Sequence, residues 1–99
     1  MAVRLVITIN AQPGKGADLL EEMEKRCAIA RAEPGCEQFE VFRSAHEPDK
    51  LCLLELWADA AALEVHATAN AAAAPNPRMA ELRADGGGGR EDYEYNRTR

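Results

Sequence analysis

The chain has 99 residues and a mass of 10.8 kDa, which predicts one domain over residues 1–99 and excludes multidomain enzymes. Its 17 acidic and 12 basic residues give a net charge of −5, which argues against nucleic acid and anionic membranes as partners. Only 22 residues are Val, Ile, Leu, Met, Phe or Trp, so we expect a thin core that is completed by a second copy of the chain. The sequence shows no signal peptide and no apolar run near the roughly 18 residues of a spanning helix, so we expect a soluble, cytoplasmic protein.

The first half of the chain predicts a strand, a helix and a second strand. Residues 3–10 alternate apolar and more polar side chains, which is typical of a half-buried strand. Turn residues at 12–16 end it, and residues 17–33 carry an apolar stripe at helical spacing. Pro34 and Gly35 end that helix, and residues 36–43 predict the second strand.

The second half predicts a strand, two helices and a last strand. Residues 50–57 are apolar on both faces, which places this strand centrally in a sheet. Asp59 is an expected N-cap for a helix over residues 60–69, which the alanines at 71–74 extend weakly. Asn76 and Pro77 predict the start of a short helix. A glycine run at 86–89 predicts a flexible break before a strand over residues 91–96.

This order of elements predicts an α+β fold of the ferredoxin-like type, a split βαβ with an antiparallel four-stranded sheet and helices on one side. The other face of such a sheet is left uncovered. Two sheets packed face to face would bury it, so we expect a homodimer with a dimeric α/β barrel.

Several short motifs occur in an informative order. Pro13-Gly14 follows the first strand, Glu33-Pro34-Gly35-Cys36 joins the first helix to the second strand, and Glu55-Leu56-Trp57 ends the third strand. Leu63 and His66 follow in the next helix. In this order the motifs resemble the antibiotic biosynthesis monooxygenase family of dimeric α+β barrels, which includes small quinol monooxygenases.

The resemblance implies a homodimer with a pocket between the sheet and helices of each protomer. It also implies a reaction of a phenol or hydroquinone with molecular oxygen that needs no metal, flavin or haem, and catalytic roles for Asn10, Trp57 and His66. Many members carry a second His near the end of the helix, where this chain has Asn70 instead. The segment in which haem-degrading relatives place a ligand His contains Ala, Asn and Pro, which disfavours haem.

Each candidate residue has a functional and a structural interpretation. His66 can exchange a proton near neutral pH, or it is a hydrogen-bonded structural histidine on an apolar helix face. Trp57 forms an aromatic pocket wall or belongs to the core. Asn10 stabilises a substrate oxyanion or caps the turn at Pro13-Gly14. Glu55 faces the pocket or pairs with an arginine such as Arg4 or Arg43, and we favour the ion pair.

The other candidate residues are assigned to the pocket, the dimer barrel or the surface. The expected substrate pocket contains Glu55, Leu63, Asn70 and Met79. Tyr93 and Tyr95 share a strand face, which is expected to line the barrel between two protomers, and His46 is expected to be exposed. Cys27, Cys36 and Cys52 fit neither a zinc site nor a disulfide framework. We expect no metal site, and the sequence has none of the glycine-rich phosphate-binding motifs.

The sequence therefore favours a cofactor-independent monooxygenase that oxidises a small aromatic such as a hydroquinone, naphthol or anthrone. In that reaction His66 would be the base or proton donor, Asn10 the anion stabiliser and Trp57 the aromatic wall. Two alternatives stay open. One is an isomerase of a small carbonyl compound with His66 or Glu55 as the proton shuttle, and the other is a dimeric ligand-binding module without catalysis.

Overall fold

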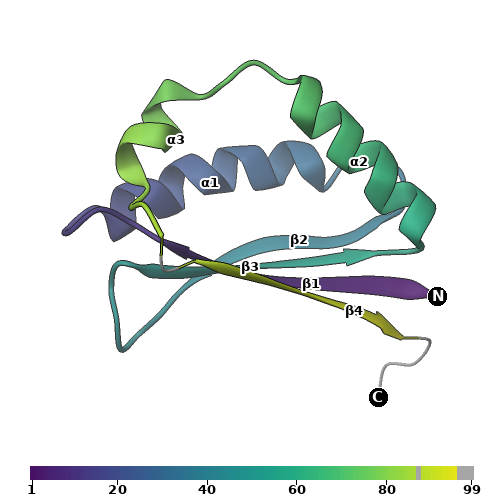
Figure 1. Ribbon diagram of the computed structural model, residues 1–99, viewed down its shortest axis with the longest axis horizontal. Helices are drawn as coiled ribbons and strands as arrows, with labels where there is room; N and C mark the ends of the chain where they lie inside the picture. The colour runs from purple at the N-terminus through teal and green to yellow at the C-terminus, as the bar shows by residue number, and fades with distance from the viewer. Residues whose placement is uncertain (87, 96–99) are drawn as a thin grey trace.

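The computed structural model describes residues 1–86 and 88–95, and it confirms the α+β, ferredoxin-like fold. The strands β1 (Ala2–Asn10), β2 (Cys36–Arg43), β3 (Lys50–Trp57) and β4 (Gly89–Tyr95) form one antiparallel sheet in the order β2-β3-β1-β4. The helices α1 (Gly16–Ala30), α2 (Ala60–Ala72) and α3 (Pro77–Leu82) lie together on one side of it (Figure 1). Within the described part of the chain, none of these helices has the length and apolar character needed to cross a membrane.

Side-chain oxygens hold the beginnings of all three helices. As predicted, Asp59 accepts a hydrogen bond from the Ala62 N–H at 2.8 Å, and Asn76 accepts one from the Met79 N–H at 3.1 Å. The turn before α1 is held by Asp49 of the β2–β3 loop, which accepts from the N–H groups of Gly14 and Gly16 at 2.9 Å each. These two bonds lower the pKa of the Asp49 carboxyl. Asp49 therefore caps this turn, a role that the sequence left open as an alternative for Asn10.

Gly16 permits the close approach of that loop to α1. A Cβ at this position would overlap the carbonyl oxygen of Pro48 and lie 2.9 Å from its carbonyl carbon. Because backbone atoms must shift to make room, Gly16→Ala is expected to lower the free energy of unfolding by roughly 1–3 kcal/mol. Urea denaturation measures this change, and Gly89→Ala is the matched control because a Cβ at Gly89 meets nothing within 4 Å. Equal stabilities of the two variants would contradict the close packing of this loop.

Several predicted boundaries differ from the structure. Helix α1 ends at Ala30 instead of residue 33, because Ala32 and Glu33 hydrogen-bond three residues back in a tighter turn that leads into β2. Helix α2 continues to Ala72. Strand β4 begins at Gly89, the last glycine of the run at 86–89, which was predicted to be a flexible break before the strand. Residue 87 of that run and residue 96 of the predicted strand lie outside the described residues.

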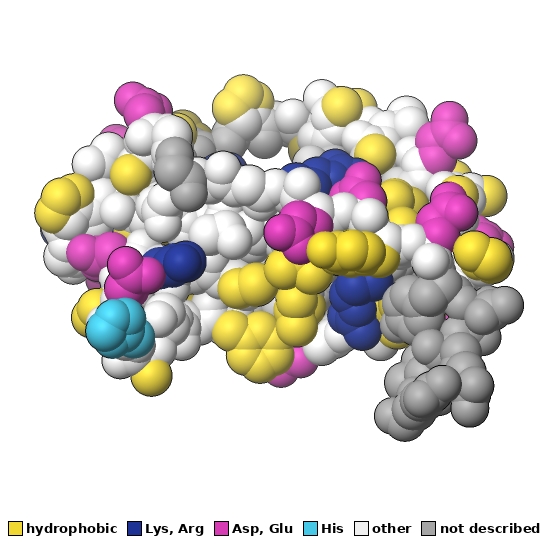
Figure 2. Space-filling view, turned by 60° about the horizontal axis from the view of Figure 1, so that its bottom comes forward, with side chains coloured by type: hydrophobic (Ala, Val, Ile, Leu, Met, Phe, Trp, Pro, Cys, Tyr) yellow, Lys and Arg dark blue, Asp and Glu magenta, His cyan; other side chains and the backbone are white. Residues whose placement is uncertain are grey.

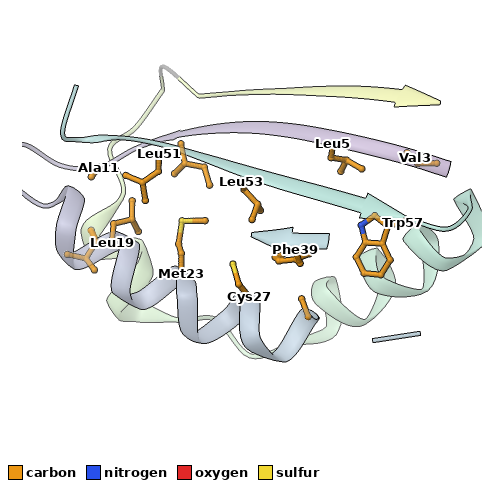
Figure 3. Packing of buried hydrophobic residues seen from close by; sticks show 13 residues of the cluster. Val3, Leu5, Ala11, Leu19, Met23, Cys27, Phe39, Leu51, Leu53 and Trp57 are labelled. Atoms are coloured by element: carbon orange, nitrogen blue, oxygen red, sulfur yellow. The ribbon is translucent and has the colours of Figure 1, made fainter. Parts of the chain in front are cut away.

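The core lies between the sheet and the helices. Side chains from β1, β2 and β3 face α1, which contributes Leu19, Met23 and Cys27 (Figure 3). Strand alternation and register decide which side chains meet there, since Leu5 lies opposite Glu55 and Ile7 lies opposite Leu53. Trp57 is fully buried at the end of β3. This register places Glu55, a carboxylate, in a row of apolar side chains.

The opposite face of the sheet carries a group of apolar side chains, which we call the open face. They lie on all four strands, at Val6, Phe42, Leu54, Leu56 and Tyr93. Figure 2 shows hydrophobic side chains gathered in the middle of this side of the molecule, with charged side chains around them. Phe42 and Tyr93 are 43% and 52% exposed, although aromatic side chains of this size are ordinarily buried.

Candidate functional site

A cavity of about 520 Å³ lies between the sheet and the helices. Its floor is formed by apolar side chains of β1 and β3, and its sides by residues of all three helices. Four residues at helical spacing on α2 line it, namely Leu63, His66, Ala67 and Asn70. Met79 of α3 lines the cavity as well. A volume of this size and an apolar lining suit a small aromatic molecule.

His66 is the histidine of this cavity, and a carboxylate orients its ring. The Nδ1 atom lies 2.7 Å from Oε2 of Glu33, which sits in the turn between α1 and β2. The two side chains are only 12% and 28% exposed. A carboxylate accepts hydrogen bonds, so Nδ1 of His66 carries the hydrogen and donates it to Glu33. In the neutral ring Nε2 is then a proton acceptor.

Nε2 of His66 borders open space. It forms no hydrogen bond with any residue that the structure describes. Over the same residues, no fully buried side-chain nitrogen or oxygen lacks a hydrogen-bond partner. An unpartnered Nε2 must therefore be accessible, and the ring lines the cavity. Carboxylate, imidazole and cavity together form the arrangement of an oriented general base.

Three aromatic rings meet beside this base. The centroid of His66 lies 4.7 Å from that of Trp57 and 5.3 Å from that of Phe39. Phe39 and Trp57 pack edge to face at 6.3 Å. Phe39 lines the cavity and Trp57 lies behind it, fully buried and outside the lining. The structure thus places Trp57 in the core, where it packs against His66. Phe39 forms the aromatic wall of the cavity that the sequence predicted for Trp57.

Glu55 is 4% exposed and takes its hydrogen bond from Trp57, whose indole Nε1–H donates to Oε1 at 2.9 Å. The expected ion pair with Arg4 or Arg43 is absent from the described residues: Arg4 donates to Gln38, and Arg43 donates to the carbonyl oxygen of Pro48. The second oxygen of Glu55, Oε2, has no hydrogen-bond partner among the described residues. Among these residues no fully buried side-chain oxygen lacks a partner, so Oε2 is accessible and borders the cavity that Glu55 lines.

The remaining candidates divide between cavity and sheet. Leu63, Asn70 and Met79, which the sequence predicts to lie in a substrate pocket, line the cavity. Asn10 is the last residue of β1, and strand alternation turns it away from Leu5, Ile7 and Ile9, which form the cavity floor. Tyr93 lies on the open face, where its hydroxyl donates to Glu91 at 2.6 Å. The side chain of Tyr95 lies outside the described residues.

The cavity also contains a thiol. Cys27 lines it, and burial raises the pKa of this thiol to about 11, so the side chain is protonated at neutral pH and is no nucleophile. Across residues 1–86 and 88–95, no three His, Cys, Asp or Glu side chains gather closely enough to hold a metal ion.

The comparison with known proteins assigns this chain to a family. The family model of antibiotic biosynthesis monooxygenase matches residues 2–75, three quarters of the chain. The chain belongs to this family. Family membership accounts for the common order of strand, proline-glycine turn, Glu-x-Trp segment and histidine-bearing helix.

One curated relative and two solved structures show how far the similarity extends. The Bacillus subtilis (strain 168) protein named "Putative monooxygenase YcnE" is 33% identical over 58 residues, which are 59% of this chain and 61% of that protein. The match therefore spans less than two thirds of that relative's length. PA3566 from Pseudomonas aeruginosa superimposes with a TM-score of 0.74 at 24% identity, covering 97% of this chain and 95% of that one.

A second crystal structure, named "a putative antibiotic biosynthesis monooxygenase from Deinococcus radiodurans", gives a TM-score of 0.75 at 19% identity. It covers 99% of this chain and 95% of that chain. At these identities the two structures support the fold of this family member.

Sequence reasoning did not single out Glu33 or Phe39 as site residues. Glu33 stands in the Glu33-Pro34-Gly35-Cys36 motif, but nothing in its spacing from His66 indicates a contact across 33 residues. Phe39 could have been found from strand parity, because it lies directly opposite Glu55 in the register of β2 and β3.

Proposed function

We propose that this protein is a monooxygenase that oxidises a small aromatic substrate, a hydroquinone, naphthol or anthrone, with molecular oxygen and without a cofactor. The observation that carries the proposal is the Glu33–His66 pair, which presents an oriented imidazole to an apolar cavity of suitable size. Membership in the antibiotic biosynthesis monooxygenase family supports the same class of reaction.

The reaction is written here for an anthrone. Nε2 of His66 removes a proton from the substrate, and the resulting anion transfers one electron to O₂. The substrate radical and superoxide combine to form a carbon–oxygen bond, and a proton on the peroxide is returned from His66. Cleavage of the O–O bond with loss of the remaining C–H proton then yields a carbonyl group and one water. One oxygen atom of O₂ thus enters the product and the other leaves as water.

The cavity contributes to this sequence by excluding water. Leu63, Met79 and the apolar floor surround the site where the radical pair would form, so that the two radicals combine before either one escapes. Phe39 lines the cavity, where its ring can pack against a planar substrate. Asn10 faces the other side of the sheet, so the proposed mechanism does not include it.

An oxygen electrode tests this proposal directly. Metal-stripped protein is supplied with hydroquinones, naphthols and anthrones, and the spontaneous rate is subtracted with heat-denatured protein. We expect saturable uptake of one O₂ per substrate and one ¹⁸O atom in the product formed under ¹⁸O₂. A complete absence of uptake above the blank over the whole panel would contradict the proposal.

A second candidate function rests on Glu55. Its free oxygen borders the same cavity as His66, so two groups that can carry a proton face one ligand. Such a pair could isomerise a small carbonyl compound by moving a proton between two carbons. In D₂O this reaction would incorporate deuterium into the substrate without consuming oxygen, which distinguishes it from oxygenation.

We also propose that the protein is a homodimer in which two open faces pack together. The apolar side chains on this face have no helix over them among the described residues, and a second sheet would bury them. We expect a mass of about twice 10.8 kDa in sedimentation equilibrium for the wild-type chain.

Leu54→Lys is expected to convert this dimer to a monomer, because Leu54 lies opposite Val6 in the middle of the open face. Val65→Lys is the control, since Val65 is 67% exposed on α2, on the other side of the sheet. A monomeric wild-type chain, or a dimer that Leu54→Lys leaves intact, would contradict this packing.

A further inference from the structure

The lining of the cavity is basic, although the chain is acidic. Three arginines line it from three different elements: Arg26 from α1, Arg83 just after α3, and Arg90 from β4. Glu55 is the one carboxylate among the described lining residues. A chain with a net charge of −5 thus places three guanidinium groups and one carboxylate around the apolar cavity of the candidate site. This excess of positive charge favours an anionic ligand.

Two of these arginines are available to a ligand. Arg90 is bound to Asp92 through Nε and Nη2, at 2.8 and 3.1 Å, so much of its charge is already compensated. Arg26 and Arg83 form no ion pair with any residue in the described part of the chain. Guanidinium groups bind carboxylates in a planar, two-pronged geometry, and these two have that capacity free.

The main chain holds Arg83 in place. Its N–H donates to the carbonyl oxygen of Met79 at 3.2 Å, and its own carbonyl oxygen accepts from Nε2 of Gln12 at 3.1 Å. It also forms an isolated bridge with Ala11, directly after β1. The side chain therefore starts from a fixed point at one end of the cavity.

The register of the sheet shows that the backbone of Arg83 lies far from His66 and Glu55. Glu55 lies opposite Leu5, Arg90 opposite Ile7, and Arg83 opposite Ala11. The residues paired with Glu55 and Arg83, Leu5 and Ala11, are six positions apart in the chain, which is roughly 20 Å at the rise of an extended chain. The cavity thus has a proton-transfer end at His66 and Glu55 and a cationic end at Arg83. Arg26 of α1 lies nearer the proton-transfer end, because it also lines a smaller hollow together with Glu33 and His66.

We propose that the substrate of this cavity is an aromatic carboxylate, with its carboxylate bound by Arg83 and its hydroxylated ring directed toward His66. The inference rests on the proposed function for the statement that the His66 end is the reacting end. Binding at the cationic end would orient the ring, because one fixed anchor limits the ways in which a planar molecule fits an apolar cavity.

Calorimetry of two matched ligands under anaerobic conditions tests the inference without turnover. The probes are 6-hydroxy-2-naphthoate and 2-naphthol, which share the ring and hydroxyl and differ in the carboxylate. In the naphthoate the hydroxyl and the carboxylate lie at opposite ends of the ring system. We expect the naphthoate to bind about tenfold more tightly, a modest ratio because Arg83 is exposed to solvent. Raising the salt concentration should reduce this advantage, and it should leave naphthol binding unchanged.

Arginine variants locate the carboxylate site. Arg83→Ala is expected to weaken naphthoate binding about fivefold and to change naphthol binding less than about twofold. Arg78→Ala is the control, because it removes the same charge from an exposed position on α3 that does not line the cavity. Equal affinity for the two probes, no binding of either, or an equal loss in Arg78→Ala would overturn the inference.

Oxygen uptake separates this inference from the proposed function. Naphthoate binding that depends on Arg83, with no oxygen uptake by any carboxylated or neutral hydroquinone, would support the carboxylate site and contradict oxygenation. Saturable uptake with neutral 1,4-naphthohydroquinone that equals uptake with its 2-carboxylate, and that Arg83→Ala leaves unchanged, would support oxygenation and overturn the carboxylate site.

Discussion

Replacing His66 by alanine is expected to lower kcat for oxygen uptake by roughly 10²- to 10⁴-fold, the usual contribution of a general base. The variant removes the proton acceptor that Glu33 orients toward the cavity. KM is expected to change less, because the rest of the cavity lining is retained. Initial rates on the most active substrate of the panel measure both constants.

The controls separate chemistry from folding. His46→Ala is the matched histidine variant, since His46 is exposed in the loop between β2 and β3, and it should retain full activity. Glu33→Gln keeps a hydrogen-bonding side chain next to Nδ1 but removes the negative charge, so we expect a smaller loss of kcat and an altered pH profile. Circular dichroism verifies that each variant is folded, and a folded His66→Ala variant with wild-type kcat would exclude His66 as the base.

The second large effect is expected on stability. Trp57→Ala should lower the free energy of unfolding by about 3–5 kcal/mol, because it removes the largest fully buried side chain and leaves a cavity. It also leaves Glu55, which is 4% exposed, without its indole donor. A domain of this kind is stable by only about 5–15 kcal/mol in total, so this variant is expected to be close to unfolding at 37 °C.

A smaller substitution isolates the hydrogen bond. Trp57→Phe retains a buried ring but removes Nε1–H, so we expect a loss of about 1–3 kcal/mol. In a Glu55→Gln background the same substitution should be less harmful, because a neutral amide is less costly to leave unpaired. Val65→Ala, at a 67% exposed position on α2, should lie within about 0.5 kcal/mol of wild type in the same urea titration. Additive losses at Trp57 and Glu55 would contradict their coupling.

The candidate site was predictable where its residues share one element. His66 and Leu63 are three positions apart on one helix, and periodicity alone places both, with Asn70, on the face that lines the cavity. The hydrogen bonds of His66 with Glu33 and of Glu55 with Trp57 were not predictable in this way, because tertiary packing determines them. The expected ion pair of Glu55 with Arg4 does not form, because Arg4 projects from the other face of β1, where alternation directs it toward Gln38.

Local rules were sufficient for the order of elements and for the helix starts at Asp59 and Asn76, since periodicity and capping act within a few residues of the chain. They also identified β3 as a central strand, because it is apolar on both faces. The tertiary structure alone decided which distant residues meet. Strand register brings Arg90 and Glu55 to one cavity, the α1–β2 turn brings Glu33 to His66, and strand parity turns Asn10 away from it. Such contacts depend on the pairing of segments far apart in sequence, and no local pattern of residues encodes that pairing.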